Sequence, residues 1–377
     1  MTVVYLDYNA TAPVRPEVLD AMHDALQAVG NASSVHGPGR AARARLDNAR
    51  DAVARLVNAA PREVYFTSGG TEANYLALRG LPAITRPGQV AVSAIEHDAV
   101  LHAAPEGCHR IPVGQDGIVD LSAFEQMLGR DRNREIGLVS VMLANNETGA
   151  VQPVAEIARL AHAHGACLHC DGVQAAGKIA IDMSTLGADM LSLSAHKLGG
   201  PQGVGALVIR NELALRAVQR GGGQERGLRG GTENVPGIAG FGVAADAAGR
   251  GLVQMAALAE LRDRLETGIA ALAPETVFFG QGVERLPNTA NFALAGARSE
   301  MQLMRLDLSG IAVSAGSACA SGKVARSHVL TAMGVAPALA DCALRVSLGW
   351  QSVPADIETF LSAWAEIAAP ETLKKAG

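Results

Sequence analysis

The chain has 377 residues, a length that predicts about two domains at roughly 100–200 residues per domain. Hydrophobic residues make up 49% of the chain and charged residues 18%, so a large core can form and disorder of the whole chain is excluded. The 32 Lys and Arg against 37 Asp and Glu give a net charge of −5, which provides no basic field for a nucleic-acid backbone. We therefore expect no direct nucleic-acid binding.

The N-terminal sequence MTVVYLDYNATAP contains no basic stretch followed by an apolar one, so it does not have the pattern of a secretory signal. The longest uncharged stretches, such as residues 308–322, are short and rich in Gly and Ser, whereas a membrane helix needs about 20 apolar residues. Five scattered cysteines are too few for a disulfide scaffold and fit a reducing compartment. The sequence predicts a cytoplasmic protein that does not cross a membrane.

Short β-rich runs alternate with helical patterns between about residues 63 and 210, which is typical of a mainly parallel sheet covered by helices. The predicted strands are VYFT, VAVSA, IGLVSVML, CLHC, MLSLSA and GALVIR, and the predicted helices include TEANYLALRG and PVAEIARLAHAHG. Polar residues follow the strands at positions 68–71, 96–97, 145–147, 171–174 and 194–197. Because ligands of open α/β sheets bind beyond the carboxyl ends of the strands, we expect one site built from these five turns.

The second half of the chain begins after the glycine-rich segment GGGQERGLRGGTEN, where one long helical pattern covers about residues 240–272. Beyond it lie strand-like VFFG, NTANFAL and LRVSLG and helical SHVLTAMG and ADIETFLSAWAEIAA, which predict a smaller α+β domain. We place the larger domain at residues 14–245. The smaller domain is expected to comprise residues 1–13 and 246–377, with a loop at about 314–326.

Three features point to a pyridoxal 5′-phosphate (PLP) site. Lys197 follows a predicted strand, and a lysine of lowered pKa forms a Schiff base with an aldehyde. The turn at residues 68–72 joins a strand to a helix and offers backbone N–H groups to a phosphate. Asp171 ends another strand, where a carboxylate can pair with a protonated pyridine nitrogen. Each has an ordinary alternative, namely a solvated loop lysine, a tight turn and a helix N-cap, but their combination with His97 favours the cofactor site.

Ten segments carry a resemblance to a known family: YLDYNATAPVRPEV, GNASSVHGPGR, FTSGGTEAN, IEHDAV, NNETG, HCDGVQAAGK, SAHKLGGPQGVGAL, GGGQERGLRGGTEN, SAGSACAS and LRVSLG. With them, nearly the entire chain resembles the fold-type I PLP enzymes, and among these the cysteine desulfurases of the NifS/IscS type. The resemblance implies an α/β fold, with a large domain built on a mainly parallel seven-stranded sheet and a smaller α+β domain. It also implies a homodimer with shared sites.

The same resemblance implies a role for each residue that matches a family motif. Lys197 would hold the cofactor aldehyde, Asp171 would face the pyridine nitrogen, and His97 would stack on the ring and act as an acid/base partner. Gln174 and Asn146 would lie near the O3′ edge of the ring. The remaining cofactor-binding residues implied are Gly70, Thr71, Ser194, Ala195, His196 and, from the partner subunit, Thr232. Arg345 would bind the substrate carboxylate through a bidentate fork, helped by Asn31.

Cys319 lies in a segment of Ala, Gly and Ser, and Lys323 and Arg326 follow it closely. Nearby cations favour the thiolate form, although a free cysteine is more often buried and inert. The resemblance implies that Cys319 is the nucleophile that takes sulfur from L-cysteine as a persulfide. We expect no intrinsic metal site, but the Cys319 persulfide could ligate a nascent iron–sulfur cluster. The other four cysteines are predicted to be structural.

The function implied is a cysteine desulfurase that releases L-alanine and passes persulfide sulfur to an acceptor or iron–sulfur scaffold protein. Iron–sulfur cluster assembly is the first destination considered, with tRNA thiolation and nitrogenase supply as others. Selenocysteine lyase, cysteine sulfinate desulfinase or aminotransferase activity on the same scaffold stays open, as does a catalytically silent sulfur-transfer scaffold.

Three departures from the family pattern stand out. Ala32 takes the place of a proline, and Gly70 that of a frequent alanine. The chain also ends soon after a predicted helix at 356–369, without the longer tail by which housekeeping members engage a scaffold protein. This last departure leaves the sulfur acceptor open.

Overall fold

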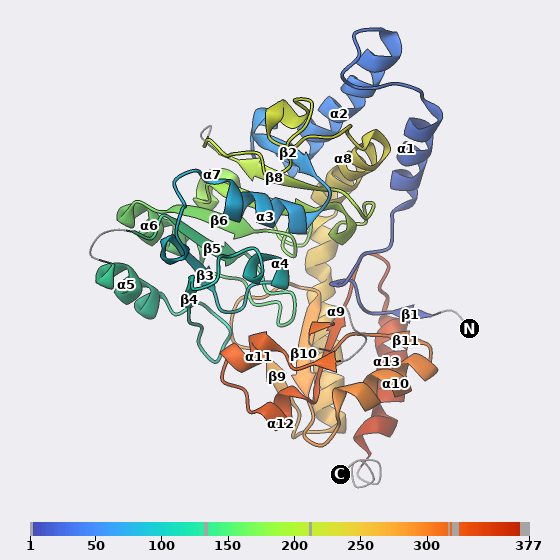
Figure 1. Cartoon of the computed structure of the whole chain (residues 1–377). Coiled ribbons are helices and arrows are strands. Elements are labelled where there is room, and N and C mark those ends of the chain that lie inside the picture. The colour runs from blue at the N-terminus through green and yellow to red at the C-terminus, as the bar shows by residue number, and fades with distance from the viewer. Residues whose placement is uncertain (1–2, 132–134, 211–212, 316, 319–323, 370–377) are drawn as a thin grey trace.

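A computed structural model of the chain describes residues 3–131, 135–210, 213–315, 317–318 and 324–369. A seven-stranded sheet forms the centre of its larger part (Figure 1). In spatial order its strands are β2 (Val64–Thr67), β8 (Gly205–Ile209), β7 (Met190–Ser194), β6 (Cys167–Asp171), β5 (Leu138–Met142), β3 (Val90–Ser93) and β4 (His109–Ile111). Only β8 runs antiparallel to its neighbours in this sheet, so the predicted mainly parallel α/β sheet is confirmed.

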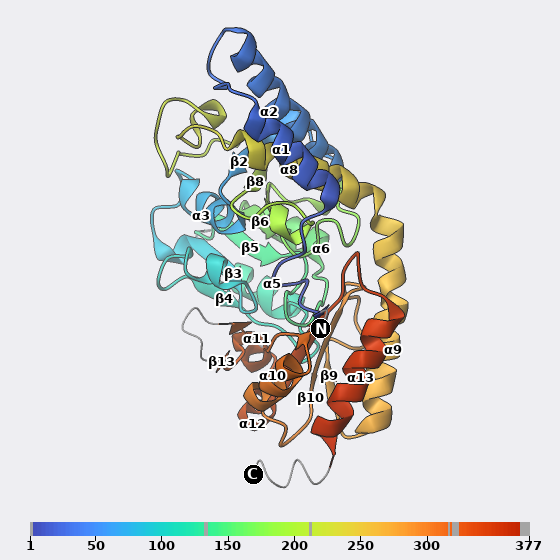
Figure 2. The same ribbon diagram turned by 90° about the vertical axis from the view of Figure 1, so that its right-hand side faces the viewer.

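Helices cover both faces of this sheet, which explains why its strands are almost wholly apolar. Alternate residues of a strand point to opposite faces, and in β5 Val139 and Val141 belong to one core cluster while Leu138 belongs to the other. Figure 2 shows α3 and α6 on opposite sides of the sheet. The helices of this part are α1 (Pro16–Gln27), α2 (Gly37–Leu56), α3 (Gly70–Gly80), α4 (Asp98–Leu101), α5 (Leu121–Arg130), α6 (Val154–His164), α7 (Met183–Leu186) and α8 (Val235–Arg250).

A second core lies in the C-terminal part, around an antiparallel sheet of order β14–β10–β9. Phe292 of β10 packs edge-on against Trp364 and Phe360, with ring centroids 5.6 and 6.4 Å away, and this confirms the predicted smaller α+β unit. Its elements are β1 (Val4–Tyr5), α9 (Leu252–Leu272), β9 (Val277–Phe279), β10 (Thr289–Ala293), α10 (Ser299–Leu308), β11 (Ile311–Ala312), α11 (His328–Ala332), α12 (Pro337–Ala340), β14 (Ala343–Ser347) and α13 (Pro354–Ala368). Two short strands, β12 (Ser317–Ala318) and β13 (Val324–Ala325), pair with each other.

The helical pattern predicted as one element over residues 240–272 forms two helices, so that prediction was wrong. The helix α8 starts earlier, at Val235, and ends at Arg250, and α9 begins at Leu252. The Gly251 N–H donates to the Ala247 and Ala248 carbonyls at 3.0 and 3.1 Å, which closes the last turn of α8. The domain limits at residues 14–245 and 246–377 stay a prediction, which the change of core near Gly251 supports.

No helix among the described residues is long and apolar enough to span a membrane.

A buried ion pair ties α2 to the glycine-rich segment that follows the sheet. Both guanidinium nitrogens of Arg50 lie 2.9 Å from the Glu225 carboxylate, which also accepts the Phe66 N–H at 2.9 Å. Glu225 and Arg226 hold left-handed backbone angles, with φ of 45° and 55°, a conformation that is costly outside glycine. The pair therefore fixes a strained turn to the edge strand β2.

Replacing Glu225 with glutamine is expected to lower the free energy of unfolding by about 3 kcal/mol, because Arg50 would keep a buried charge without a carboxylate partner. Urea unfolding of both proteins measures the difference. A matched control is Asp246→Asn, which breaks an exposed pair between Arg55 of the same helix and Asp246 and is expected to cost less than about 1 kcal/mol. Equal losses in the two variants would contradict the assigned role of Glu225.

Candidate active site

A cavity of about 260 Å³ lies beyond the carboxyl ends of β5, β6 and β7. The strand register brings these ends together, since Met142 pairs with Asp171 and Asp171 with Ser192. All five turns considered from the sequence reach this region. The predicted residues that line the cavity are Gly70, Thr71, His97, Asn146, Asp171, Gln174, Ser194, His196 and Lys197, and the further lining residues are Asn74, Ala99, Met142, Ala144 and Val173.

Lys197 ends a 3₁₀ turn (Ala195–Lys197) that follows β7 directly. Its amine donates to the backbone carbonyls of Asn9 at 2.5 Å and Ala10 at 2.8 Å. Burial lowers the pKa of Lys197 to about 8, and the Arg345 charge acts in the same direction, while Asp7 and Asp171 oppose it. A substantial share of this amine is therefore neutral near neutral pH, and the neutral form is the one that attacks an aldehyde.

The rate at which cofactor-free protein binds an aldehyde cofactor should follow this pKa. We expect the rate to rise about tenfold per pH unit up to pH 7 and to level off above pH 8–9, because the neutral fraction of Lys197 saturates there. The growth of the cofactor's absorption after mixing measures the rate. A free lysine derivative, the control, should keep gaining rate above pH 9, and a protein profile that does the same would contradict the lowered pKa.

Asp171 closes β6 and lines the cavity. Its carboxylate accepts the Asn74 amide at 2.7 Å and the Val173 N–H at 2.9 Å, which holds it in place. Burial raises the pKa of Glu96 well above its ordinary value, and the charge of Asp171 adds to this. Both effects favour the protonated form of Glu96, which places no second negative charge beside Asp171.

His97 precedes the short helix α4, and its ring lines the cavity. Its Nδ1 accepts the Ala99 N–H at 3.0 Å, so the neutral ring carries its proton on Nε2. Desolvation lowers the pKa of His97, with a further contribution from the Lys197 charge. The ring is neutral at neutral pH and can stack on, or donate to, a planar ligand.

The N-terminus of α3 meets the cavity at Gly70 and Thr71, and a helix N-terminus with free N–H groups attracts phosphate. A Cβ atom on Gly70 would lie 2.8 Å from Cγ2 of Val173. Gly70 stands where the family frequently has alanine. Val173 leaves no room for an alanine side chain at this position unless one of the two residues shifts. Nearby, burial lowers the pKa of His196 to about 4, so its ring offers hydrogen bonds and no charge.

Comparisons with known proteins identify the family of this chain. The sequence profile of the class-V aminotransferases matches residues 4–360. The chain belongs to the class-V aminotransferase family. A cysteine desulfurase of Cereibacter sphaeroides is 47% identical over 371 residues, covering 96% of this chain and 94% of the relative. An IscS-like cysteine desulfurase of Mycobacterium tuberculosis is 40% identical, with 95% and 94% covered. The solved NifS-like protein of Rickettsia africae superposes with a TM-score of 0.88 at 34% identity, with 97% of this chain and 99% of that chain covered.

Three residues predicted for the site, Ala195, Thr232 and Asn31, do not line the cavity in the single chain. Ala195 is completely buried and does not line the cavity. Thr232 and Asn31 are exposed, and the Asn31 side chain accepts the Ser33 N–H at 2.8 Å. Cys319, the predicted nucleophile, lies outside the described residues.

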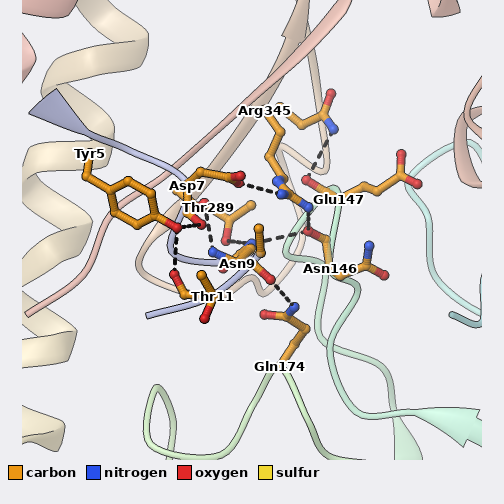
Figure 3. A network of polar contacts seen from close by, with 12 residues as sticks. Tyr5, Asp7, Asn9, Thr11, Asn146, Glu147, Gln174, Thr289 and Arg345 are labelled. Atoms are coloured by element: carbon orange, nitrogen blue, oxygen red, sulfur yellow. Dashed lines mark hydrogen bonds and ion pairs between the residues drawn. The ribbon is translucent and has the colours of Figure 1, made fainter. Parts of the chain in front are cut away.

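Arg345 is buried on β14 and is not among the residues that line the cavity. Figure 3 shows its guanidinium turned toward Asp7 and Asn146, whose carboxylate and backbone carbonyl accept at 2.6 and 3.0 Å. Its Nε has no partner among the described residues. To bind a substrate carboxylate, Arg345 would have to exchange its pair with Asp7.

Sequence reasoning missed four polar residues around the cavity of this class-V aminotransferase. Each of the four lies in a segment that carries the family resemblance. The segments were therefore noticed, but no chemical role was assigned to these four residues. They are Asn9 in YLDYNATAP, Asn74 in FTSGGTEAN, Glu96 in IEHDAV and Lys178 in HCDGVQAAGK.

Proposed function

We propose that this chain is a PLP-dependent cysteine desulfurase, which removes sulfur from L-cysteine and releases L-alanine. The observation that carries the proposal is the cavity in which the Lys197 amine and the Asp171 carboxylate meet the N-terminus of α3. Relatives named cysteine desulfurase, 39–47% identical over nearly the full chain, supply the choice of substrate.

The side chains around the cavity are of the chemical types that can bind PLP. The Lys197 amine of lowered pKa would take the aldehyde, the Asp171 carboxylate would pair with the pyridine nitrogen, and Thr71 with the α3 N–H groups would hold the phosphate. The neutral ring of His97 offers a flat surface for stacking. When bound, PLP supplies an electron sink for charge that develops at the substrate Cα.

The chain's own groups then divide the work. Lys197, neutral near its pKa of about 8, removes the proton from the substrate Cα and later returns a proton to the product. Asp171 keeps a proton on the pyridine nitrogen. Arg345 binds the substrate carboxylate after releasing Asp7.

We assign the sulfur transfer to Cys319. Its thiolate attacks the substrate sulfur, the bond from that sulfur to the substrate Cβ breaks, and a sulfur–sulfur bond to Cys319 forms. The electron pair of the broken bond stays with the carbon skeleton, which takes up a proton. L-cysteine and the Cys319 thiol thus give L-alanine and a Cys319 persulfide, with no external oxidant or reductant.

We further propose that two copies of the chain form a homodimer and that the persulfide goes to an acceptor protein of iron–sulfur cluster assembly. The exposed Thr232 supports the first point, because it lies outside the cavity of its own chain and so is free to meet the site of a second copy. Size-exclusion chromatography with light scattering tests the dimer.

Product analysis tests the proposed reaction. L-cysteine, selenocysteine and cysteine sulfinate are offered separately to cofactor-loaded protein, and alanine is measured against time. We expect L-cysteine to give alanine, with one sulfur released per alanine when a thiol reductant is present. Alanine from selenocysteine or sulfinate alone, or a keto acid in its place, would overturn the assignment.

A further inference from the structure

Lys178 is a second lysine at this site, and the proposed reaction does not use it. It lies between β6 and α7 and is 5% exposed. Its amine donates to the Asn9 side-chain oxygen at 2.6 Å and to the Gln174 side-chain oxygen at 2.7 Å. Among the described residues it forms no ion pair with a carboxylate, which is unusual for a buried lysine.

The surroundings of Lys178 favour its neutral form. Burial lowers its pKa well below the ordinary lysine value, and the charges of Lys197 and Arg345 act in the same direction. A neutral amine has two N–H groups, and the two side-chain oxygens of Asn9 and Gln174 match that number. Through these two bonds Lys178 acts here as a pair of hydrogen-bond donors.

These two bonds fix which way two side-chain amides point. With its oxygen bound by Lys178, the Gln174 amide must present its NH₂ end on the other side, where it donates to the Asn9 backbone carbonyl at 2.9 Å (Figure 3). Gln174 also lines the cavity, so the orientation of its amide matters to a ligand bound there.

Asn9 is held in the same manner. Lys178 and the Asn288 amide bind its side-chain oxygen, and its NH₂ end donates to Thr289 Oγ1 at 2.9 Å. The backbone carbonyl of Asn9 also accepts the Lys197 amine at 2.5 Å. The buried Lys178 thus fixes the orientation of two side chains at the site. One is Asn9, whose backbone carbonyl contacts Lys197, and the other is Gln174.

We propose that Lys178 is a positioning residue: it locks Gln174 with its NH₂ end toward the ring oxygen of the bound cofactor, and holds the Asn9 carbonyl that supports Lys197. The proposal rests on the proposed function, because it assumes PLP on Lys197. A donor on the ring oxygen stabilises its negative charge, and so lowers the pKa at which the lysine–cofactor linkage loses its proton.

The test is an absorption titration of the cofactor-loaded protein, which needs no substrate. Lys178→Met removes both donors and keeps an unbranched side chain that is one atom shorter, and we expect the linkage pKa to rise by about one unit. Gln174→Leu should raise it similarly. The double variant should raise it no further than the larger single change, because both act through one hydrogen bond. The titratable groups around the linkage are Asp7, Asp171, Arg345, His97 and His196, and they stay the same in every variant. Lys178, which also interacts with Lys197, is unchanged in Gln174→Leu, so that variant tests the hydrogen bond without a change of charge.

An unchanged titration in Lys178→Met beside a shifted one in Gln174→Leu would overturn the proposal, as would fully additive shifts. If Lys178→Met does not fold, Lys178→Gln keeps an NH₂ donor group on a shorter side chain and should show a smaller rise. Thermal unfolding of each variant separates positioning from stability, since a purely structural lysine would lower the melting temperature and leave the titration unmoved. Failure of the parent protein to bind PLP would instead count against the proposed function.

Discussion

Replacing Lys197 with alanine is expected to lower alanine formation from L-cysteine by at least about 10³-fold. The variant loses both the covalent attachment of the cofactor and the base that takes the Cα proton. The cofactor should still bind through the phosphate turn and Asp171, which line the same cavity, but it should be removed by dialysis. Alanine assays and phosphate analysis of the dialysed protein measure the two effects.

Chemical rescue distinguishes the loss of the amine from damage to the fold. A small primary amine such as methylamine should restore part of the activity of the alanine variant, because it can occupy the space of the missing Lys197 side chain and carry the proton. Persistent full activity in the variant would mean that another group performs the chemistry. Lys178 would be the first candidate, because it is also buried and its pKa is also lowered.

The second large effect is expected for Cys319→Ser. We expect alanine formation to fall by roughly 10³-fold or more, because a serine hydroxyl is a far weaker nucleophile than a thiolate. The absorption of the bound cofactor should stay unchanged, since the groups around the cavity are intact. The combination of a normal spectrum with lost turnover is the expected signature of a missing sulfur acceptor.

Cys342→Ser is the matched control for that substitution. The Cys342 thiol is buried and donates to the Ala338 carbonyl at 3.3 Å, a bond that serine can also make. Burial raises the pKa of Cys342, as it does for Cys167 and Cys170, so these thiols are poor nucleophiles. We expect the control to retain activity. Full turnover in Cys319→Ser would show that the nucleophile is assigned to the wrong residue.

The seven-stranded sheet could be predicted from the sequence because its central strands are short apolar runs, each followed by polar residues. VYFT, CLHC and MLSLS became β2, β6 and β7. The same reasoning located the turns around the cavity, since parallel strands end at one edge. Lys197 and Asp171 were predicted for this site because their types match the chemistry of an aldehyde cofactor, and both line the cavity.

Other features depend on contacts between distant parts of the chain, and no local pattern indicates them. The break at Gly251 was missed because apolar spacing continues through it, and only the capping bonds to Ala247 and Ala248 reveal it. The pair of Arg345 with Asp7 joins residues 338 positions apart. Lys178 is 5% exposed, and no local pattern in the sequence indicates that the fold buries it.

The central claim is that Lys197, and no other lysine, holds PLP in this cavity. Borohydride reduction of the cofactor-loaded protein, followed by protease digestion and mass spectrometry, locates the attachment directly. We predict one cofactor per chain, on the peptide that contains Lys197. Attachment of the cofactor to Lys178 would contradict the account. So would the absence of a covalently attached cofactor in protein that has bound PLP.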